Sequence, residues 1–560
     1  MIDRAWEINL PDEGIVKKLA KALDVSKNIA NLLVSRGIKT FEDARLYFRP
    51  QLSHLNDPFM MKNMSHAVKR LEIAISKNQK ILVYGDYDVD GTTSVAMMYA
   101  FLKTYTKNID YYIPCRYEEG YGISFKGIDY AYEKKYSLII ALDCGINAVD
   151  KVDYANRLGV DFIICDHHNP SDKIPNAIAV LNPKQHDCRY PYKDLSGCGV
   201  GFKLIQAYCL FCDISFNKII EYLDLLVVSI AADIVPLTGE NRVLAFYGLK
   251  QINFRPRVGL KALIDASQKT EELVMSDLVF GIAPRINAAG RIDHAKKAVN
   301  ILVESDYDKA KLFAIEIEEN NKTRKDLDKI ITNDALKMIK KNKKSTVVFS
   351  KKWHKGVVGI VASRLIESYY RPTIVLTEKN GVLTGSARSV HDFDLYKAIS
   401  KCSHLCEKFG GHKYAAGLSI KKENLNAFIN KFESVVSESL NEDQLRPKIH
   451  VDMQIDIDEI DNKFYRILKQ FAPFGPSNLS PVFISKAVVD NGFGKKIGAD
   501  KSHLRINIKK QNGSISAVGF GMGHFFDKIK DYNRFDVCYS IGENEWRGKK
   551  NLQLVLVDIK

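Results

Sequence analysis

Short apolar runs alternate with stretches of helical periodicity between about residues 76 and 303. Three of these runs, at 81–84, 137–142 and 161–165, are rich in Ile, Leu and Val and stop at or just before an aspartate. Such alternation is typical of a parallel α/β sheet, in which each strand is followed by a covering helix. We therefore predict a parallel-sheet domain over 76–303 whose strand ends carry acidic side chains.

The first 75 residues show apolar positions at helical spacing, for example Ile15, Leu19 and Leu23, then Ile29 and Leu33. This spacing predicts helices. We expect residues 1–75 to form an N-terminal helical cap on the domain that follows, without chemistry of their own.

A long helical segment is predicted over 304–341. Nine consecutive polar residues, 318–326, occupy its middle, and apolar residues such as Ile317 and Leu327 flank them at helical spacing. A helix that is apolar at both ends and polar in the middle is suited to bridging two domains. A short coiled coil is the alternative, but its apolar seam would be interrupted for too long.

A second, smaller α/β domain is expected over 342–445. It opens on the β-rich run 346–349 and contains two glycine-bearing segments, 385–388 and 410–417. Glycines let backbone amides approach a ligand closely, and the adjacent Arg388 and His412 suit phosphate. A pair of tight turns is the alternative reading.

Past residue 447 the pattern changes to short, alternating strand-like runs with glycines between them, such as 482–484, 504–508 and 552–556. Many short strands with glycine turns predict a small β-barrel over 446–560. An OB-type barrel fits the size and the basic, aromatic context, and an SH3-like barrel fits the pattern nearly as well.

The 560 residues allow three or four domains. A formal net charge of +15 favours a polyanionic partner, and nucleic acid is the usual one. The ten cysteines form no regular framework, and no apolar run approaches the ~20 residues of a membrane span. We expect a cytoplasmic protein without membrane attachment, and the absence of a G-x-x-x-x-G-K-[ST] loop argues against ATP use.

Three aspartates at alternating positions, Asp86, Asp88 and Asp90, follow the first apolar run. Three carboxylates within five residues repel one another unless a cation neutralises them. An acidic turn on a solvated surface is the alternative. The apolar strand that precedes the turn would bury its base, and this favours a metal site.

Further candidate ligands end the other runs: Asp143 the second, Asp166-His167-His168 the third, and Asp233 an apolar helix-like run over 225–232. Ligands of an open parallel sheet bind beyond the carboxyl ends of its strands, so these side chains can converge. Asp and His without thiolates suit Mn²⁺ or Mg²⁺ better than Zn²⁺. The set is large enough for two ions about 3.5–4 Å apart. Asp143 is the natural bridging ligand, whereas Asp166 fits either metal binding or the orientation of a neighbouring ligand.

Four segments resemble the four motifs of the DHH phosphoesterase family and occur in the same order as in that family. They are 84–91, 143–145, 166–168 and 232–237. Residues 410–417 are similar to the signature of the DHHA1 domain that accompanies it. Segments 114–122, 284–291, 353–360 and 473–478 are similar to those of the bacterial single-strand-specific exonucleases of this family. The resemblance covers roughly residues 75–560.

The resemblance implies an α/β fold with a parallel-sheet DHH domain, a long bridging helix, a smaller α/β DHHA1 domain and a C-terminal OB-like β-barrel. It implies metal-dependent 5′→3′ degradation of single-stranded DNA to 5′-mononucleotides in DNA repair and recombination, with two Mn²⁺ or Mg²⁺ ions. The expected partners are single-stranded DNA, a single-strand-binding protein and a DNA helicase, and the expected state is a monomer.

The same resemblance assigns roles on this sequence. The expected metal ligands are Asp86, Asp88, Asp90, Asp143, His167 and Asp233. Asp166 and His168 are expected in catalysis, where His168 would stabilise the scissile phosphate. The expected contacts to the 5′-terminal phosphate and the DNA are Arg116, Arg285, Ser386, Arg388 and His412. Independently of the resemblance, the basic and aromatic character of the barrel makes candidate DNA contacts of Arg505, Lys509, Lys510, Trp546 and Arg547, with a solvated basic face as the alternative for each.

Two other functions compete with this one. A small-substrate phosphoesterase of the same family, such as a nano-RNase, typically has two domains, so the barrel and the charge of +15 speak against it. A non-catalytic replication scaffold of the same fold would have lost metal ligands, whereas every motif position is filled here.

Overall fold

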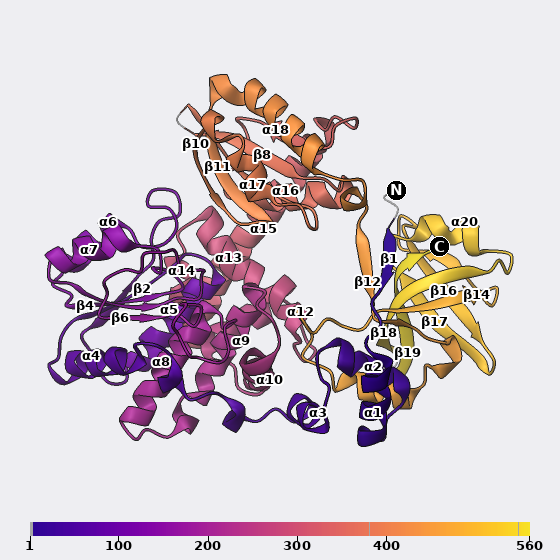
Figure 1. Cartoon of the computed structure of the whole chain (residues 1–560), viewed down its shortest axis with the longest axis horizontal. Helices are drawn as coiled ribbons and strands as arrows, with labels where there is room; N and C mark the ends of the chain where they lie inside the picture. Colours follow the sequence, from indigo (N-terminus) through magenta and orange to yellow (C-terminus); the bar gives the residue numbers. More distant parts are fainter. Residues whose placement is uncertain (1–3, 380, 547) are drawn as a thin grey trace. The chain divides into compact units, whose positions relative to one another are not determined.

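The structure is a computed structural model that describes residues 4–379, 381–546 and 548–560 (Figure 1). Its chain divides into two compact units. The first contains residues 45–323 and 471–480, and the second contains the residues before 45 together with 324–470 and 481–560. The division falls inside α15 (Tyr307–Lys337), a single helix of 31 residues.

The first unit is built on five parallel strands in the order β3-β2-β4-β5-β6. Along β2, Ile81 and Val83 enter one core, and Leu82 and Tyr84 enter the core on the opposite face. Because both faces are covered, the central strands read as continuous apolar runs. The strands are β2 (Ile81–Gly85), β3 (Ile109–Tyr112), β4 (Leu138–Leu142), β5 (Asp161–Cys165) and β6 (Ala179–Leu181).

Helices cover both faces of this sheet, which confirms the predicted parallel α/β domain. Figure 1 shows α6 (Phe125–Glu133) and α7 (Val149–Arg157) on one face and α4 (Met64–Ser76) and α8 (Gly197–Phe211) on the other. The core on the α8 side continues into further helices: α5 (Val89–Leu102), α9 (Leu223–Ala232), α10 (Gly239–Phe254), α11 (Val258–Ala266), α13 (Ala283–Ile292) and α14 (Lys296–Val303). The carboxyl ends of β2, β4 and β5 carry the acidic motifs.

The long helix α15 contributes to two cores. Ala314 and Ile317 pack in the core of the first unit, and Ile331 and Ala335 pack in a core of the second. The long helix that is apolar at both ends therefore forms, over 307–337 where the sequence predicted 304–341. Its polar middle is not uniformly solvated, because Asn321 is only 1% exposed.

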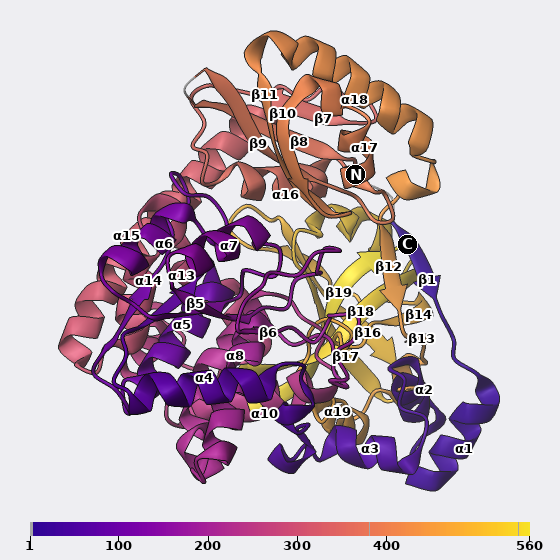
Figure 2. The same cartoon turned by 60° about the vertical axis from the view of Figure 1, so that its left-hand side comes forward.

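The second unit contains a smaller sheet in the order β10-β11-β9-β8-β7, in which only β7 and β8 are parallel. One face packs against α16 (Val358–Ser368), and the other packs against α17 (Leu395–Ser400) and α18 (Leu425–Ser439). Figure 2 shows α18 lying along this sheet. The strands are β7 (Thr346–Phe349), β8 (Thr373–Lys379), β9 (Val382–Arg388), β10 (Cys406–Gly411) and β11 (Ala415–Lys421).

The C-terminal residues form a seven-stranded sheet in the order β13-β14-β18-β19-β17-β16-β15, as the strand pattern predicts. Alternation along β16 places Leu504, Ile506 and Ile508 in the interior. The strands are β13 (Met453–Gln454), β14 (Phe483–Val488), β15 (Lys495–Ile497), β16 (His503–Lys510), β17 (Gly513–Gly519), β18 (Phe535–Trp546) and β19 (Lys549–Ile559).

The N-terminal segment differs from the expected helical cap on the 76–303 domain. Its helices α1 (Glu13–Leu23) and α2 (Lys27–Ser35) form, but β1 (Ala5–Ile8) pairs in parallel with β12 (Lys448–Val451). Arg36 and Asp452 form an ion pair of 2.9 Å. Residues 4–44 therefore belong to the second unit, whereas α4 packs in the core of the first unit, as expected of a cap. A four-residue strand is too short for a clear alternating pattern, and its partner lies far along the chain.

Across the part of the chain that the structure describes, no helix combines the length and the apolar character needed to cross a bilayer.

Candidate metal centre

Three aspartates lie where β2 ends and α5 begins. The Asp88 side chain caps α5 by accepting the backbone N–H of Gly91 at 3.0 Å, and Asp90 lies buried in the first turn. The turn requires glycine at position 91, because a Cβ there would lie 2.4 Å from the carbonyl oxygen of Asp86. The local sequence thus fixes all three carboxylates at one end of the sheet.

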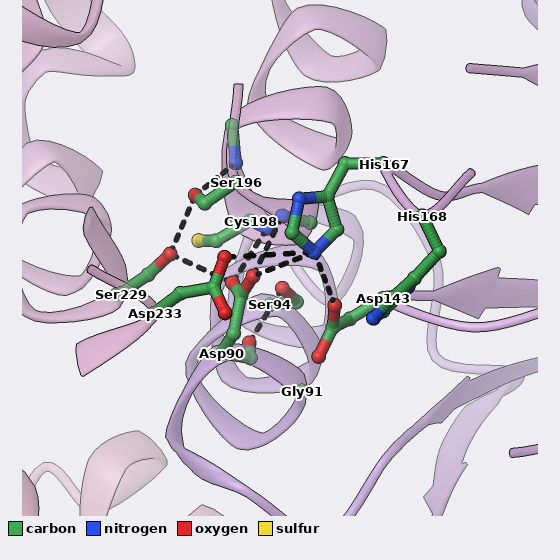
Figure 3. Close-up of polar contacts among 12 residues, drawn as sticks. Asp90, Gly91, Ser94, Asp143, His167, His168, Ser196, Cys198, Ser229 and Asp233 are labelled. Carbon is green, nitrogen blue, oxygen red and sulfur yellow. Dashed lines mark hydrogen bonds and ion pairs between the residues drawn. The ribbon is translucent and has the colours of Figure 1, made fainter. Parts of the chain in front are cut away.

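Asp90 is held by the N-terminus of α8. Its two carboxylate oxygens accept the backbone N–H groups of Gly197 at 2.7 Å and Cys198 at 2.8 Å, and Oδ1 also accepts the Ser229 hydroxyl at 2.7 Å (Figure 3). The free N–H groups and the dipole of a helix N-terminus favour a carboxylate. Position 197 also requires glycine because of Asp143, since a Cβ there would lie 2.5 Å from Cβ of Asp143.

Three carboxylates surround one imidazole nitrogen. Nε2 of His167 lies 3.2 Å from Oδ1 of Asp143, 3.6 Å from Oδ2 of Asp233 and 3.7 Å from Oδ2 of Asp90 (Figure 3). These side chains come from the ends of β4, β5 and α9 and from the first turn of α5. Four segments that are far apart in sequence therefore meet at one point.

Burial and neighbouring charges shift the pKa values of the clustered side chains. Burial, followed by the charges of Asp90 and Asp88, raises the pKa of Asp143 well above its usual range and the pKa of Asp233 to about 8. Burial lowers the pKa of His167, so its imidazole stays neutral and keeps a lone pair for a cation.

The carboxylate oxygens and the imidazole nitrogen of this site are suitable ligands for divalent cations. Among the residues that the structure describes, Oδ2 of Asp86, Oδ1 of Asp143 and Nε2 of His167 are buried without a hydrogen-bond partner. His167 and Asp143 lie 3.2 Å apart, but their alignment is not that of a hydrogen bond. Buried acceptors without donors, on several mutually repelling carboxylates, are the pattern that a cation neutralises.

Two overlapping groups of three residues each place their potential metal-ligand atoms within 4.8 Å of one another. One group is Asp90, His167 and Asp233, and the other is Asp143, His167 and His168. Asp88 adjoins them, since its charge raises the pKa of both Asp143 and Asp233. The arrangement accommodates two cations that share ligands.

Asp166 is committed to hydrogen bonds. It is fully buried, and its oxygens accept the backbone N–H groups of Ile146, His167 and His168 and the Nδ1–H of His168 at 2.7 Å. Burial works to raise its pKa, but these bonds hold the pKa at about 2. Burial likewise disfavours a charged His168, yet Asp166 raises the pKa of this imidazole to about 9. Of the two roles open to Asp166, this geometry favours orientation of His168.

The side chains predicted for phosphate binding are distributed over both units. In the first, the Arg116 guanidinium lies 4.8 Å from the ring centre of Tyr87, and Arg285 pairs with Glu318 at 2.6 Å. In the second, Arg388 donates to the Ser386 hydroxyl at 2.8 Å, and His412 is exposed beside the turn that joins β10 to β11.

Within this set, Arg116 interacts electrostatically with the first acidic motif. Burial raises the pKa of Asp86 well above its usual range, and the charge of Arg116 works against this rise. The guanidinium therefore lies close enough to the first acidic motif to act on it.

Three of the candidate DNA contacts in the barrel lie on β16, and their side chains differ in direction. Arg505 and Lys509 point outward from the sheet, whereas Lys510 donates to the backbone oxygen of Ile460 at 2.8 Å. Arg547 and the side chain of Trp546 lie outside the described residues.

Sequence reasoning missed several members of the site. Ser229, Gly197 and Cys198 hold Asp90, and the Tyr121 hydroxyl lies 3.0 Å from Nε2 of His168. Only Tyr121 had a sequence signal, since it lies in the segment 114–122 that resembles the exonucleases.

Family models match three parts of the chain. Residues 80–230 match the DHH family, N-terminal domain, residues 330–438 match the DHHA1 domain, and residues 451–558 match the RecJ OB domain. Asp86, Asp88, Asp90 and Asp143 lie within the first match, and Asp233 lies just beyond its end.

The chain is also similar to whole proteins. It is 38% identical over 564 residues to the single-stranded-DNA-specific exonuclease RecJ of Bacillus subtilis, covering 99% of this chain and 70% of that protein. The crystal structure of RecJ from Thermus thermophilus in complex with Mn²⁺ matches with a TM-score of 0.87 and 26% identity, over 100% of this chain and 80% of that one. The Mg²⁺ complex of the same protein matches with a TM-score of 0.80 and 25% identity, over 100% and 78%. At this identity and coverage, the chain belongs to the RecJ family within the DHH phosphoesterases.

Proposed function

We propose that this protein is a metal-dependent, single-strand-specific 5′→3′ DNA exonuclease that releases 5′-mononucleotides in DNA repair and recombination. One observation carries the proposal: three carboxylates from separate segments converge on Nε2 of His167 at the carboxyl ends of a parallel sheet. The relatives named single-stranded-DNA-specific exonuclease support the choice of substrate.

In this proposal, Asp86, Asp88, Asp90, Asp143, His167 and Asp233 hold two cations, Mn²⁺ or Mg²⁺. Cations held there supply a nucleophile at neutral pH and neutralise the charge that develops on the phosphate. Asp90 is held in place by the N-terminus of α8, and Asp143 presents an oxygen that no protein donor occupies. His168, kept protonated by Asp166, stabilises the charge that develops on the phosphate through its own positive charge.

A second group of residues is proposed to bind the 5′-terminal phosphate. Ser386 and Arg388 lie on one face of β9, against the first turn of α16, where a Cβ on Gly359 would meet Oγ of Ser386 at 3.1 Å and Nη2 of Arg388 at 3.2 Å. An Arg fork, a hydroxyl and a helix N-terminus are a suitable set of donors for phosphate. Arg116, Arg285 and His412 complete the proposed set of DNA contacts.

The Arg388→Ala protein is expected to lose the preference for a 5′-phosphate. We expect the wild type to degrade 5′-phosphorylated strands about ten times faster than 5′-hydroxyl strands, since a charge-assisted bond contributes about 1.5–3 kcal/mol. Initial rates on the two substrates give the ratio for each protein, and Lys397→Ala, an exposed change on α17, is the control. Equal wild-type rates on the two substrates would contradict the assignment of Arg388 to the 5′-terminal phosphate.

The setting of the activity is also a proposal. All ten cysteines are free thiols, which fits a reducing compartment such as the cytoplasm. A monomer is proposed to act with a helicase that separates strands and with a single-strand-binding protein. The outward Arg505 and Lys509 are proposed to attract the strand by charge.

Digestion of end-labelled DNA tests the proposed function. Single-stranded DNA labelled at either end, the corresponding duplex, and oligonucleotides from two nucleotides upward are each incubated with Mn²⁺, with Mg²⁺ and with EDTA. The proposal predicts mononucleotides released from the 5′ end of long single strands, only with a metal. Preference for dinucleotides would favour the small-substrate phosphoesterase, and no turnover on any substrate would favour the non-catalytic scaffold.

A further inference from the structure

We infer that Tyr121 is a positioning residue that acts through His168, with its hydroxyl fixing the orientation of the imidazole beside the carboxylate cluster. This inference rests on the proposed function, in which His168 meets the scissile phosphate. Tyr121 is absent from every role assigned above.

The contact has the geometry of a directed hydrogen bond. Oη of Tyr121 lies 3.0 Å from Nε2 of His168, and the two rings meet edge to face at 80° with centres 5.8 Å apart. The other ring nitrogen, Nδ1, lies 2.7 Å from Oδ1 of Asp166. Both nitrogens of His168 therefore have a partner, so the ring plane is held from two sides.

The hydroxyl also connects His168 to the metal ligands. Oη of Tyr121 lies 3.0 Å from Nε2 of His168 and 3.4 Å from the backbone carbonyl oxygen of Asp143. This chain of hydrogen bonds links the ends of β4 and β5.

The backbone around Tyr121 is built to aim this side chain. Gly120 and Gly122, on either side, have φ of +86° and +81°, a conformation that favours glycine. The Gly122 N–H donates to Oδ1 of Asp86 at 3.2 Å, and its carbonyl accepts the Tyr84 hydroxyl at 3.0 Å. The loop is thus anchored to β2 and to the first acidic motif.

The side chain of Tyr121 is 55% exposed, although its hydroxyl is committed to His168. An exposed aromatic residue gains little stability from burial, so folding alone does not explain its placement. An imidazole with one hydrogen bond can turn about that bond, whereas two bonds leave it oriented before the substrate arrives.

The test compares kcat and KM of the Tyr121→Phe protein with those of the wild type on 5′-phosphorylated single-stranded DNA with Mn²⁺. Removal of an orienting hydrogen bond is expected to lower kcat about tenfold and to leave KM unchanged. The melting temperature is expected to stay the same, because the ring remains. An unchanged kcat, or a raised KM with an unchanged kcat, would overturn the inference.

A double-mutant cycle shows whether Tyr121 acts through His168. Tyr121→Phe is introduced into the wild type and into the His168→Ala protein, and single-turnover rates are compared. The inference predicts a loss of about tenfold in the first background and none in the second. An equal loss in both backgrounds would contradict it.

The Tyr117→Phe protein is the matched control. Tyr117 lies in the same loop, and its hydroxyl donates to the backbone carbonyl of Arg291. Its kcat is expected to match that of the wild type, and a loss equal to that of Tyr121→Phe would assign the effect to the loop as a whole. If the wild type itself does not degrade single-stranded DNA, the proposed function fails first. If it does and Tyr121→Phe matches it, only this inference fails.

Discussion

The Asp143→Ala protein is expected to degrade single-stranded DNA at least about a thousandfold more slowly than the wild type, because a held cation contributes several kcal/mol to the transition state. Asp143 is 2% exposed, and its Oδ1 faces Nε2 of His167 without a hydrogen-bond partner. Its carboxylate is the group best placed to be shared between two cations. The measurement is the single-turnover rate with saturating Mn²⁺.

Strand binding is expected to survive this change. Asp143 carries no positive charge, so its loss does not weaken attraction of a polyanion, and anisotropy of a labelled strand without metal should show equal or tighter binding. Asp143 has φ of +59°, a conformation in which alanine is strained by about 1–2 kcal/mol. Asp143→Asn tolerates this conformation and is expected to lose as much activity as Asp143→Ala.

Asp150→Asn removes an exposed carboxylate of the same unit and is expected to retain full activity. Retained cleavage by both Asp143 variants would remove the two-cation assignment. Loss of activity in the Asp150→Asn protein would show that the rate follows net charge and not the cluster.

The Asp166→Asn protein is expected to lose about a hundredfold in kcat at pH 8.5, because the Asp166 carboxylate orients His168 and keeps it charged. Asp166 raises the pKa of His168 to about 9, so the wild type keeps the protonated imidazole until the pH rises through that value. Without the carboxylate, the pKa of His168 falls toward the ordinary histidine value of about 6.5.

The difference in kcat between the wild type and the Asp166→Asn protein is expected to depend on pH. Below about pH 6 His168 is protonated in both proteins, and the loss reflects orientation alone. Between about 6.5 and 9 only the wild type keeps the charge, so the ratio of the two rates is expected to grow with pH. The pH profile of kcat is the measurement. A ratio that is constant across this range would contradict the proposed role of the His168 charge.

The positions of the acidic motifs could be predicted from sequence because each depends on a local rule. Asp86, Asp143 and Asp166 follow continuous apolar runs, and such runs form the buried strands of a parallel sheet whose carboxyl ends share one edge. The bridging helix was predictable for the same reason, since its periodicity is local. The N-terminal strand β1 was not, because its four residues acquire their meaning from a partner near residue 450.

The division of roles within the motifs could not be predicted. Asp90 and Asp166 belong to similar acidic motifs, yet Asp90 faces His167 while four N–H groups occupy Asp166. The difference depends on where α8 and the residue 146 backbone lie, which is a tertiary property. Ser229 could not be predicted because a lone hydroxyl carries no pattern, and Tyr121 lies in a segment with a sequence signal, but its contact with His168 is a tertiary property.

In the proposed enzyme, divalent cations are enclosed by Asp90, Asp143, His167 and Asp233. The most direct test is a crystal of this protein grown with Mn²⁺ and measured at the manganese absorption edge. We expect two anomalous peaks about 3.5–4 Å apart, both among these four side chains and at least one of them in contact with Asp143. A map without a peak at this cluster, in a protein that degrades single-stranded DNA under the same conditions, would contradict it.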